Sequence, residues 1–327
     1  MLVLSREDVR SSITMEMAIE QAKKAYIEYS AGEAVVPVRT QIPMAAEKGI
    51  VLFMPGYSPG IGAVGLKAVS VFPGNAALGL ATINALVCLV DTETGYPLAV
   101  MEGGYLTALR TGAASGVATQ FLARGDVAVL AIIGSGVQAR TQLEAVCQVR
   151  SITKVLVFDL SLDRAALFVQ EMAANFPHLD FEITATSDEA VQQADVVVCT
   201  TTSKKPVFSG KAVRPGTHIN GVGSFTPQMQ EVGADVVVAA AKIVVDSREA
   251  IWEEAGDLII PRNQGLISEK DIYAEIGEIA SGQKAGREKP DEITFFKTVG
   301  MALQDVTVAK LVYQRAKELG RGTSIQL

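Results

Sequence analysis

The stretch VAVLAIIGSGVQAR at residues 127–140 decides the fold of this 327-residue chain. An apolar run, Val127–Ile133, predicts a buried strand, and a glycine turn and a helix follow it. Gly134, Gly136 and Ala139 fit the pattern G-x-G-x-x-A. In that pattern the first glycine makes the turn, the second lets the backbone approach a pyrophosphate, and the alanine permits close helix–sheet packing. Because helix N-termini attract phosphate, the stretch predicts a dinucleotide-binding unit.

The sequence after this stretch alternates between strand and helix patterns. Strands are predicted at 154–159, 181–186, 195–201, 217–223 and 242–247, and helices at 138–149, 162–175 and 188–193. Such alternation predicts a doubly wound parallel sheet, so the fold class is α/β with a Rossmann domain. We expect one closing helix at residues 291–319.

The sequence before this stretch has a different pattern. A helix with Ser5 and Thr14 as possible N-caps is predicted over 5–31. Strands separated by proline and glycine are predicted at 35–42, 50–54, 63–71, 83–90 and 97–101, and they indicate an antiparallel sheet. A helix rich in small residues is predicted at 106–124.

The composition and charge make several classes of partner and location less favoured. Hydrophobic residues make up 49% of the chain and the formal net charge is −7, which argues against nucleic acid or an anionic membrane as partner. No apolar run is long enough to span a bilayer and no basic leader is present, so we expect a cytoplasmic protein. Cys88, Cys147 and Cys199 are expected to be reduced, and with His178 and His218 they form no metal-ligand spacing.

Two features after the glycine turn suggest further cofactor contacts. Asp159 ends the next predicted strand, where an acid accepts hydrogen bonds from the adenosine ribose and repels a 2′-phosphate. This favours NAD over NADP, although the nearby Arg164 leaves NADP use open. Thr201 lies at the end of another strand, where a hydroxyl contacts the dinucleotide or alternatively caps a loop.

Three cations are embedded in apolar sequence: Arg39, Lys67 and Arg110. Burying such side chains is costly unless they are paired. A carboxylate substrate would pair them, since the arginine fork suits bidentate contact. The alternative is structural ion pairs, with Glu102 as a partner of one cation.

The chain resembles the ornithine cyclodeaminase/μ-crystallin family. The resemblance rests on KAVSVFPGN (67–75), on residues 79–116 from GLATINALV to RTGAASG, and on IIGSGVQAR (132–140), HINGVGS (218–224) and FFKTVGMALQDV (295–306). It implies a homodimer whose subunit has a substrate-binding and dimerisation α+β domain, 1–118 plus 302–327, and an inserted Rossmann domain, 119–301. Members of this family include ornithine cyclodeaminases, alanine dehydrogenases, ketimine reductases and Δ1-pyrroline-2-carboxylate reductases.

The resemblance also implies roles for individual residues. Substrate contacts fall on Arg39, Lys67, Arg110, Phe225, Val299 and Gly300, with the three cations as the catalytic set. Cofactor contacts fall on Thr82, Arg110, Thr111, Gly134, Gly136, Val137, Gln138, Asp159, Thr201, Val222, Gly223, Ser224 and Thr298.

One position departs from the cyclodeaminase pattern. Ornithine cyclodeaminases carry an aspartate that handles the substrate amine where this chain has Phe225. Phenylalanine cannot bind an ammonium by charge or relay a proton, so Glu102 or Glu231 would have to replace that aspartate. We therefore expect an NAD(P)H-dependent reductase of a cyclic imino acid such as Δ1-pyrroline-2-carboxylate. Ornithine cyclodeaminase, an alanine dehydrogenase-like enzyme and a cofactor-bound ligand-binding protein are the alternatives.

Overall fold

A computed structural model describes residues 1–45 and 48–326, and two compact units make up the chain. The first unit comprises Met1–Arg110 and Met301–Leu327, and the second comprises Thr111–Gly300. The chain passes from the first unit to the second within a helix, and it returns to the first unit just after a short strand. None of the described helices is both long and apolar enough to cross a membrane.

The first unit is built on a mixed sheet with the order β15-β1-β6-β5-β4-β3-β2. Its strands are β1 (Leu2–Leu4), β2 (Thr40–Pro43), β3 (Ile50–Ser58), β4 (Ala63–Val71), β5 (Ile83–Val90), β6 (Pro97–Glu102) and β15 (Thr323–Ser324). Neighbouring strands from β2 to β6 pair antiparallel as predicted, whereas β1 pairs parallel with β6. Its helices are α1 (Arg6–Ser12), α2 (Met15–Ser30) and α11 (Ala302–Glu318), with a 3-10 turn at Pro73–Leu78.

The predicted N-terminal helix is two helices. Ser5 caps α1 by accepting from the backbone N–H of Asp8, and Thr14 caps α2 by accepting from that of Met17. Ile13 lies between them with extended backbone angles, φ −144° and ψ 142°. Both predicted N-caps are therefore used, because each one begins a separate helix.

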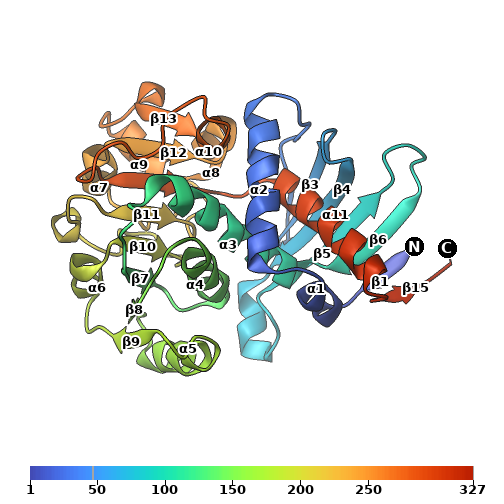
Figure 1. The fold of residues 1–327 in the computed structure, drawn as a ribbon, viewed down its shortest axis with the longest axis horizontal. Helices are drawn as coiled ribbons and strands as arrows, with labels where there is room; N and C mark the ends of the chain where they lie inside the picture. The colour runs from blue at the N-terminus through green and yellow to red at the C-terminus, as the bar shows by residue number, and fades with distance from the viewer. Residues whose placement is uncertain (46–47, 327) are drawn as a thin grey trace. The chain divides into compact units, whose positions relative to one another are not determined.

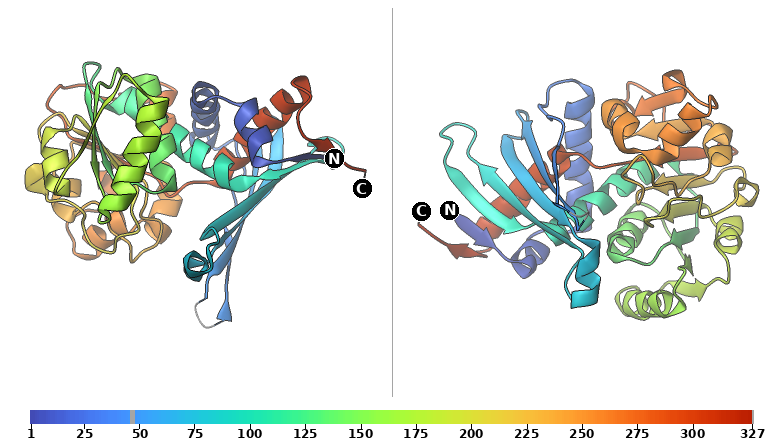
Figure 2. Two further views of the ribbon diagram at one scale, coloured as in Figure 1. Left: turned by 90° about the horizontal axis from the view of Figure 1, so that it is seen from below. Right: turned by 180° about the vertical axis from the view of Figure 1, so that it is seen from behind.

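Helices cover only one face of this sheet (Figures 1 and 2). Successive side chains of a strand point to opposite faces of the sheet. Met54 of β3 and Val69 of β4 therefore point to the helix-covered face, where they are buried in one cluster with Ala302 of α11. The opposite face, which we call the outer face, is apolar and exposed. It carries Val3, Ile42, Phe53 and Leu86, whose exposed fractions are 36%, 44%, 38% and 43%, and the half-buried Leu66 and Val100.

The second unit is a parallel sheet with the order β13-β12-β14-β11-β10-β7-β8-β9, which confirms the predicted Rossmann class. Its strands are β7 (Val129–Ile133), β8 (Lys154–Phe158), β9 (Asp180–Ile183), β10 (Val196–Cys199), β11 (His218–Gly221), β12 (Lys242–Val245), β13 (Ile272–Glu275) and β14 (Thr294–Lys297). Its helices are α4 (Val137–Val149), α5 (Leu162–Asn175), α6 (Ser187–Gln193), α7 (Ala234–Ala239), α8 (Arg248–Glu254), α9 (Gly256–Asn263) and α10 (Ile276–Ala280); α3 (Gly103–Leu122) begins in the first unit and ends in this one.

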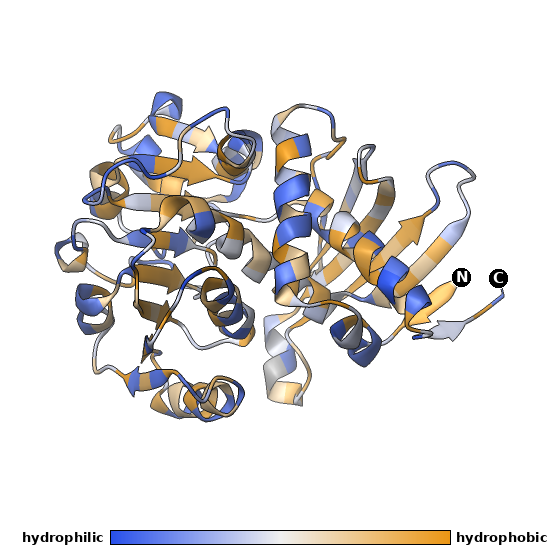
Figure 3. Ribbon diagram, viewed as in Figure 1, coloured by the Kyte–Doolittle hydropathy of each residue, from blue (hydrophilic) through white to orange (hydrophobic). Residues whose placement is uncertain are grey.

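The central strands of the second unit are buried on both faces, as parallel strands usually are. All four residues of β10, β11, β12 and β14 are buried, and two hydrophobic clusters fill the space on either side of the sheet. Burial here includes polar residues, such as His218 and Asn220 of β11, and Figure 3 shows helices with both hydrophobic and hydrophilic residues around the sheet.

The single closing helix expected at residues 291–319 is wrong. Residues Thr294–Lys297 form β14, which pairs with β11 and β12 in the middle of the parallel sheet, and only α11 is helical. A run of four fully buried residues is too short to distinguish strand from helix by its periodicity. Gly300, with φ 76°, separates the two elements by a backbone conformation that glycine favours. The sequence prediction also missed α7–α10 and β13.

Candidate active site

Lys67 lies on the inner, helix-covered face of the first unit's sheet. In the antiparallel register it stands between Met54 of β3 and Val87 of β5, and its exposed fraction is only 2%. The apolar sequence around this lysine therefore reflects real burial. A buried ammonium needs a charged or hydrogen-bonded partner.

That partner is Asp305 of α11, which the sequence prediction missed. Lys67 Nζ lies 2.7 Å from Oδ2 of its carboxylate, and Arg110 Nε lies 2.9 Å from Oδ1. Asp305 is fully buried, and Arg110 is 5% exposed. An acid inside the apolar stretch MALQDV was the available signal, since a buried carboxylate also requires a partner.

Gln304 completes this group of polar side chains. Its Oε1 accepts from Arg110 Nη1 at 3.3 Å, and its Nε2 donates to the hydroxyl of Tyr26 at 2.7 Å. The guanidinium of Arg110 is therefore held on two sides by α11. A cation fixed in this way keeps its orientation without help from a ligand.

The ion-paired group carries more positive than negative charge. Lys67 and Arg110 share the single carboxylate of Asp305, so one positive charge is in excess while Lys67 is protonated. Burial and the nearby Arg110 lower the pKa of Lys67 to about 7, although Asp305 raises it; Arg39 lowers it further. The excess charge makes the group suited to an anion, and the lowered pKa makes Lys67 suited to proton transfer near neutral pH.

Glu102 does not pair with these cations. Its carboxylate accepts from the backbone N–H groups of Gly104 at 2.8 Å and Tyr105 at 2.9 Å, in the first turn of α3. An acid at a helix N-terminus satisfies free N–H groups and complements the helix dipole. The suggested ion pair for Glu102 is therefore wrong, while Lys67 and Arg110 do form a structural pair through Asp305.

The glycine turn of the second unit has the geometry that the sequence pattern predicts. Gly134 has φ 90°, and a Cβ placed on it would lie 2.7 Å from Cγ2 of Thr201. Gly136 is the N-cap of α4, and a Cβ on it would meet nothing within 4 Å. The first glycine is thus required by conformation and packing, whereas the second leaves open space at a helix N-terminus, where phosphate binds.

Asp159 is fixed beside this turn. One carboxylate oxygen accepts from the backbone N–H and the hydroxyl of Ser135, each at 2.8 Å, and the other accepts from the N–H of Ser161 at 2.9 Å. Burial raises the pKa of Asp159, but these hydrogen bonds outweigh it and hold the pKa below its usual value. The acid is therefore ionised at neutral pH and presents a negative charge next to the glycine turn.

The residues around the turn fit a dinucleotide. The Oε1 atom of Gln138 is buried, and within the described part of the chain it has no hydrogen-bond partner. Val137, at the first position of α4, is 67% exposed. Both features lie at a helix N-terminus, so the oxygen of Gln138 and the side chain of Val137 are available to a ligand there.

Two further segments are predicted to contact the cofactor or the substrate, and in each of them a buried acid accepts backbone N–H groups. Oδ2 of Asp246 accepts from the hydroxyl of Thr298 at 2.6 Å and from the N–H groups of Val299 at 2.9 Å and Gly300 at 2.8 Å. Glu231 does the same for Thr201, Gly223 and Ser224, whose backbone N–H groups donate to its carboxylate, and the neighbouring Val222 is buried. Sequence reasoning missed the role of Asp246 and named Glu231 only as a replacement acid.

The remaining predicted residues divide between the two units. In the first unit, Arg39 is half-buried, and exposed Thr82 accepts the N–H of Phe72 on its carbonyl at 2.8 Å. In the second unit, Thr111 is buried and accepts Nε2 of Gln142 on its carbonyl at 3.0 Å, while Phe225 is half-buried.

Cysteine, histidine and acidic side chains are the possible metal ligands among the residues that the structure describes. No three His, Cys, Asp or Glu side chains there gather in a way that could hold a metal ion. The three cysteines are free; Cys199 is buried, whereas Cys88 and Cys147 are only half-buried. Of the three, only Cys199 is therefore part of the fully buried core.

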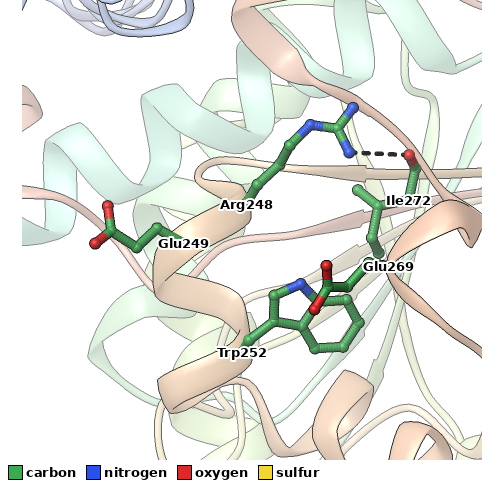
Figure 4. A pocket seen from close by; sticks show the side chains of 5 residues that line it. All are labelled: Arg248, Glu249, Trp252, Glu269 and Ile272. Atoms are coloured by element: carbon green, nitrogen blue, oxygen red, sulfur yellow. Dashed lines mark hydrogen bonds between the residues drawn. The ribbon is translucent and has the colours of Figure 1, made fainter.

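A separate hollow of about 500 Å³ lies in the second unit (Figure 4). Its lining consists of Arg248, Glu249, Trp252, Glu269 and Ile272, and Arg248 donates to the carbonyl of Ile272 at 3.0 Å. The guanidinium of Arg262 already covers the ring of Trp252, 4.6 Å from its centroid. None of the predicted site residues lines this hollow.

The parallel sheet, the glycine turn at a helix N-terminus and the fixed acid together define a dinucleotide-binding α/β protein. Comparison with known proteins makes the class narrower. Residues 1–320 match the ornithine cyclodeaminase/mu-crystallin family. The chain belongs to that family.

Several relatives match the chain over all or nearly all of its length. A Δ1-pyrroline-2-carboxylate reductase of Bacillus cereus is 46% identical over 326 residues, which is 100% of both chains. The solved structure of Thermococcus litoralis Δ1-pyrroline-2-carboxylate reductase in complex with NADH and L-proline is 45% identical, with a TM-score of 0.96 and coverage of 99% of this chain and 100% of that chain. An archaeal alanine dehydrogenase dimer with bound NAD is 39% identical, with a TM-score of 0.93 and coverage of 99% and 98%.

Proposed function

We propose that this protein reduces Δ1-pyrroline-2-carboxylate, or a closely similar cyclic ketimine acid, to the corresponding amino acid with NAD(P)H. The observation that carries the proposal is the buried group in which Lys67 and Arg110 share the single carboxylate of Asp305. The excess positive charge matches a carboxylate substrate, and Lys67 has a proton to exchange near pH 7. The similarity to Δ1-pyrroline-2-carboxylate reductases supports this substrate class.

The three cations of the first unit bind the substrate and supply a proton in this reaction. Arg110 and Arg39 bind the substrate carboxylate, and the fixed guanidinium of Arg110 sets its orientation. Lys67 holds a proton at Nζ for the imine nitrogen, and a protonated imine accepts hydride more readily at its carbon. When bound, NAD(P)H supplies that hydride. Asp159 favours NAD, because its charge opposes a 2′-phosphate.

Phe225 favours the ketimine over an open-chain diamino acid. Phe225 is half-buried, follows the strand that ends at Gly221 and supplies no charge for the ammonium of an open-chain diamino acid. Glu231 does not replace the missing acid, since its carboxylate accepts backbone N–H groups of Thr201, Gly223 and Ser224. Glu102 is likewise occupied by the backbone. Release of ammonia from ornithine is therefore disfavoured.

A substrate panel tests the proposal. The absorbance of NADH and NADPH is followed with pyrroline-2-carboxylate, piperideine-2-carboxylate and pyruvate plus ammonia, and ammonia release is measured separately with ornithine. We expect oxidation of NADH with a cyclic ketimine and little ammonia from ornithine. Turnover of pyruvate plus ammonia without turnover of either ketimine would assign an alanine dehydrogenase instead.

We propose further that two copies of this chain pair through the outer face of the first unit's sheet. Phe53, Leu66, Leu86 and Val100 form a continuous apolar surface there, and exposed surfaces of this kind mark interaction sites. Light scattering on a size-exclusion column should give the mass of a dimer, and Phe53→Glu should give a monomer. A wild-type monomer at micromolar concentration would contradict the proposal. A cytoplasmic location stays a prediction.

A further inference from the structure

Glu231 ties together the ends of two neighbouring strands. Strands β10 and β11 are adjacent and parallel, and Thr201 and Gly223 lie just beyond their carboxyl ends. Oε1 of Glu231 accepts from the N–H of Thr201, and Oε2 accepts from the N–H groups of Gly223 at 2.6 Å and Ser224 at 2.9 Å. The exposed fraction of Glu231 is 0%. One carboxylate thus fixes the backbone of two loops.

The packing leaves no freedom at this point. A Cβ on Gly223 would lie 2.1 Å from the carbonyl oxygen of Thr201, 2.5 Å from its nitrogen and 2.8 Å from Oε1 of Glu231. The two loops therefore leave no room for a side chain between them, and the carboxylate lies beside the contact. Any residue other than glycine would push the loops apart.

Two more buried charges surround Glu231. Oδ1 of Asp257 accepts from the backbone N–H groups of Glu231 at 2.7 Å and Val232 at 3.0 Å. Lys297 of β14 joins Oδ2 of Asp257 at 2.8 Å to the carbonyl of Ser224 at 2.6 Å. Asp257 and Lys297 are both fully buried. With all three side chains ionised, this charge cluster has one negative charge in excess.

The strand order tells which half of the cofactor this charge cluster serves. The glycine turn and Asp159 follow β7 and β8, so the adenosine half belongs to that side of the sheet. The order reverses between β7 and β10, and β10, β11 and β14 form the second mononucleotide half. The loops held by Glu231 therefore belong to the nicotinamide half.

We propose that Glu231 is a positioning residue for the nicotinamide half of the cofactor, and that the excess negative charge of Glu231, Asp257 and Lys297 favours the oxidised ring over the reduced one. This proposal rests on the proposed function. The oxidised nicotinamide ring bears a positive charge that the reduced ring lacks. Positive charge develops on that ring as hydride leaves, and a fixed negative charge in a buried site stabilises it.

The charge also depends on pH. Burial and the neighbouring Asp257 raise the pKa of Glu231 to about 7, against the opposing effect of Lys297 and the hydrogen bonds from Thr201. The ionisable groups that face Glu231 are Asp257 on α9, Lys297 on β14 and Cys199 on β10, whose thiol has its own pKa raised by burial. The preference for NAD⁺ should therefore strengthen as the pH rises through about 7.

Cofactor binding without substrate tests the proposal. The dissociation constants of NADH and NAD⁺ are measured by calorimetry at pH 6 and pH 8 for the wild type, Glu231→Gln and the matched control Asp195→Asn. Asp195 is a suitable control because its carboxylate also accepts two backbone N–H groups, those of Ala128 and Val129. It lies before the amino end of β10, whereas Glu231 acts at the carboxyl ends of the strands.

We expect Glu231→Gln to weaken NAD⁺ about tenfold more than NADH at pH 8 and to abolish the pH dependence of that ratio, as loss of one nearby buried charge should. Asp195→Asn should leave the ratio unchanged. Equal weakening of both cofactor forms by Glu231→Gln, or no weakening of either, would overturn the proposal. Because binding is read without substrate, failure on every ketimine would refute only the proposed reaction.

A second variant separates charge from position. Asp257→Asn removes one negative charge while Glu231 keeps its three N–H partners. The affinity ratio should then shift in the same direction as in Glu231→Gln, whereas faster hydrogen exchange at Thr201, Gly223 and Ser224 should occur only in Glu231→Gln. A shift of exchange without a shift of the ratio in either variant would reduce Glu231 to a structural residue. Asp257→Asn also decides the charge argument if Glu231→Gln fails to fold.

Discussion

Replacing Asp305 by asparagine removes the charge that Lys67 and Arg110 share while keeping the shape of the side chain. Both contacts are short, 2.7 and 2.9 Å, and Asp305 is fully buried. At an effective dielectric constant of about 20, two unit charges roughly 4 Å apart attract by about 4 kcal/mol, and desolvation offsets much of that gain. Removing one partner of a buried pair costs about 3–5 kcal/mol. Because Lys67 can lose its proton, we expect about 3 kcal/mol less free energy of unfolding.

The same change should alter the pH dependence of catalysis. Burial and Arg110 lower the pKa of Lys67 and Asp305 raises it, and the resulting pKa is about 7. Without the carboxylate the pKa of Lys67 falls below that value, so the protonated amine is lost at lower pH. In the wild type, kcat/KM for the ketimine should decrease as the pH rises through about 7, and in Asp305→Asn this decrease should begin at lower pH.

Urea unfolding and kcat/KM measured from pH 5.5 to 9 check both expectations. Asp91→Asn is the control, since Asp91 is a half-buried acid of the same unit that accepts from the turn residues Glu93 and Thr94. If Asp305→Asn unfolds within about 0.5 kcal/mol of the wild type and keeps its pH profile, the shared carboxylate has no role and the reasoning is refuted.

Three other perturbations address separate parts of the site. Arg110→Lys should weaken transition-state binding by about 2–3 kcal/mol and so lower kcat/KM, because a lysine cannot reproduce the fork that contacts Asp305 and the substrate. Near-normal kinetics in a folded variant would make Arg110 a structural residue. Asp159→Ala should reduce the preference for NADH over NADPH in steady-state kinetics, and a wild type that already prefers NADPH strongly would contradict this expectation. Phe225→Asp should depress reduction of the cyclic ketimine, because the new carboxylate needs desolvation beside the ring; unchanged ketimine kinetics would show that the substrate ring does not approach this position.

The elements that sequence predicted well have a strong local signal. Strands β4 and β5 and helix α5 have the predicted bounds, because alternation or helical periodicity extends over their whole length. Strand β14 is not predictable in this way, because its four residues are all buried and show no alternation of polar and apolar side chains. The N-terminal helix was joined across Ile13 because the break depends on the backbone of one residue, while the capping signal at Thr14 was visible.

The candidate site divides along the same line. Gly134, Gly136 and Asp159 belong to one local motif, so their arrangement follows from sequence spacing. Asp305 contacts Lys67 and Arg110 across long separations in the chain, and Glu231 contacts Thr201 and Gly223 across a sheet edge. Only the folded chain identifies such pairs, because many acids could in principle serve as the partner of a buried cation.

The bare outer face of the first sheet makes protein concentration a variable in every experiment on this chain. If a second copy covers Phe53 and Leu86, mass action couples folding to association, and the melting temperature rises with concentration. Dilution before an assay would then lose activity slowly, at the rate of dissociation. Co-expressing an inactive variant would titrate intact subunits into mixed pairs, so the residual activity of such mixtures would report whether one subunit works without the other.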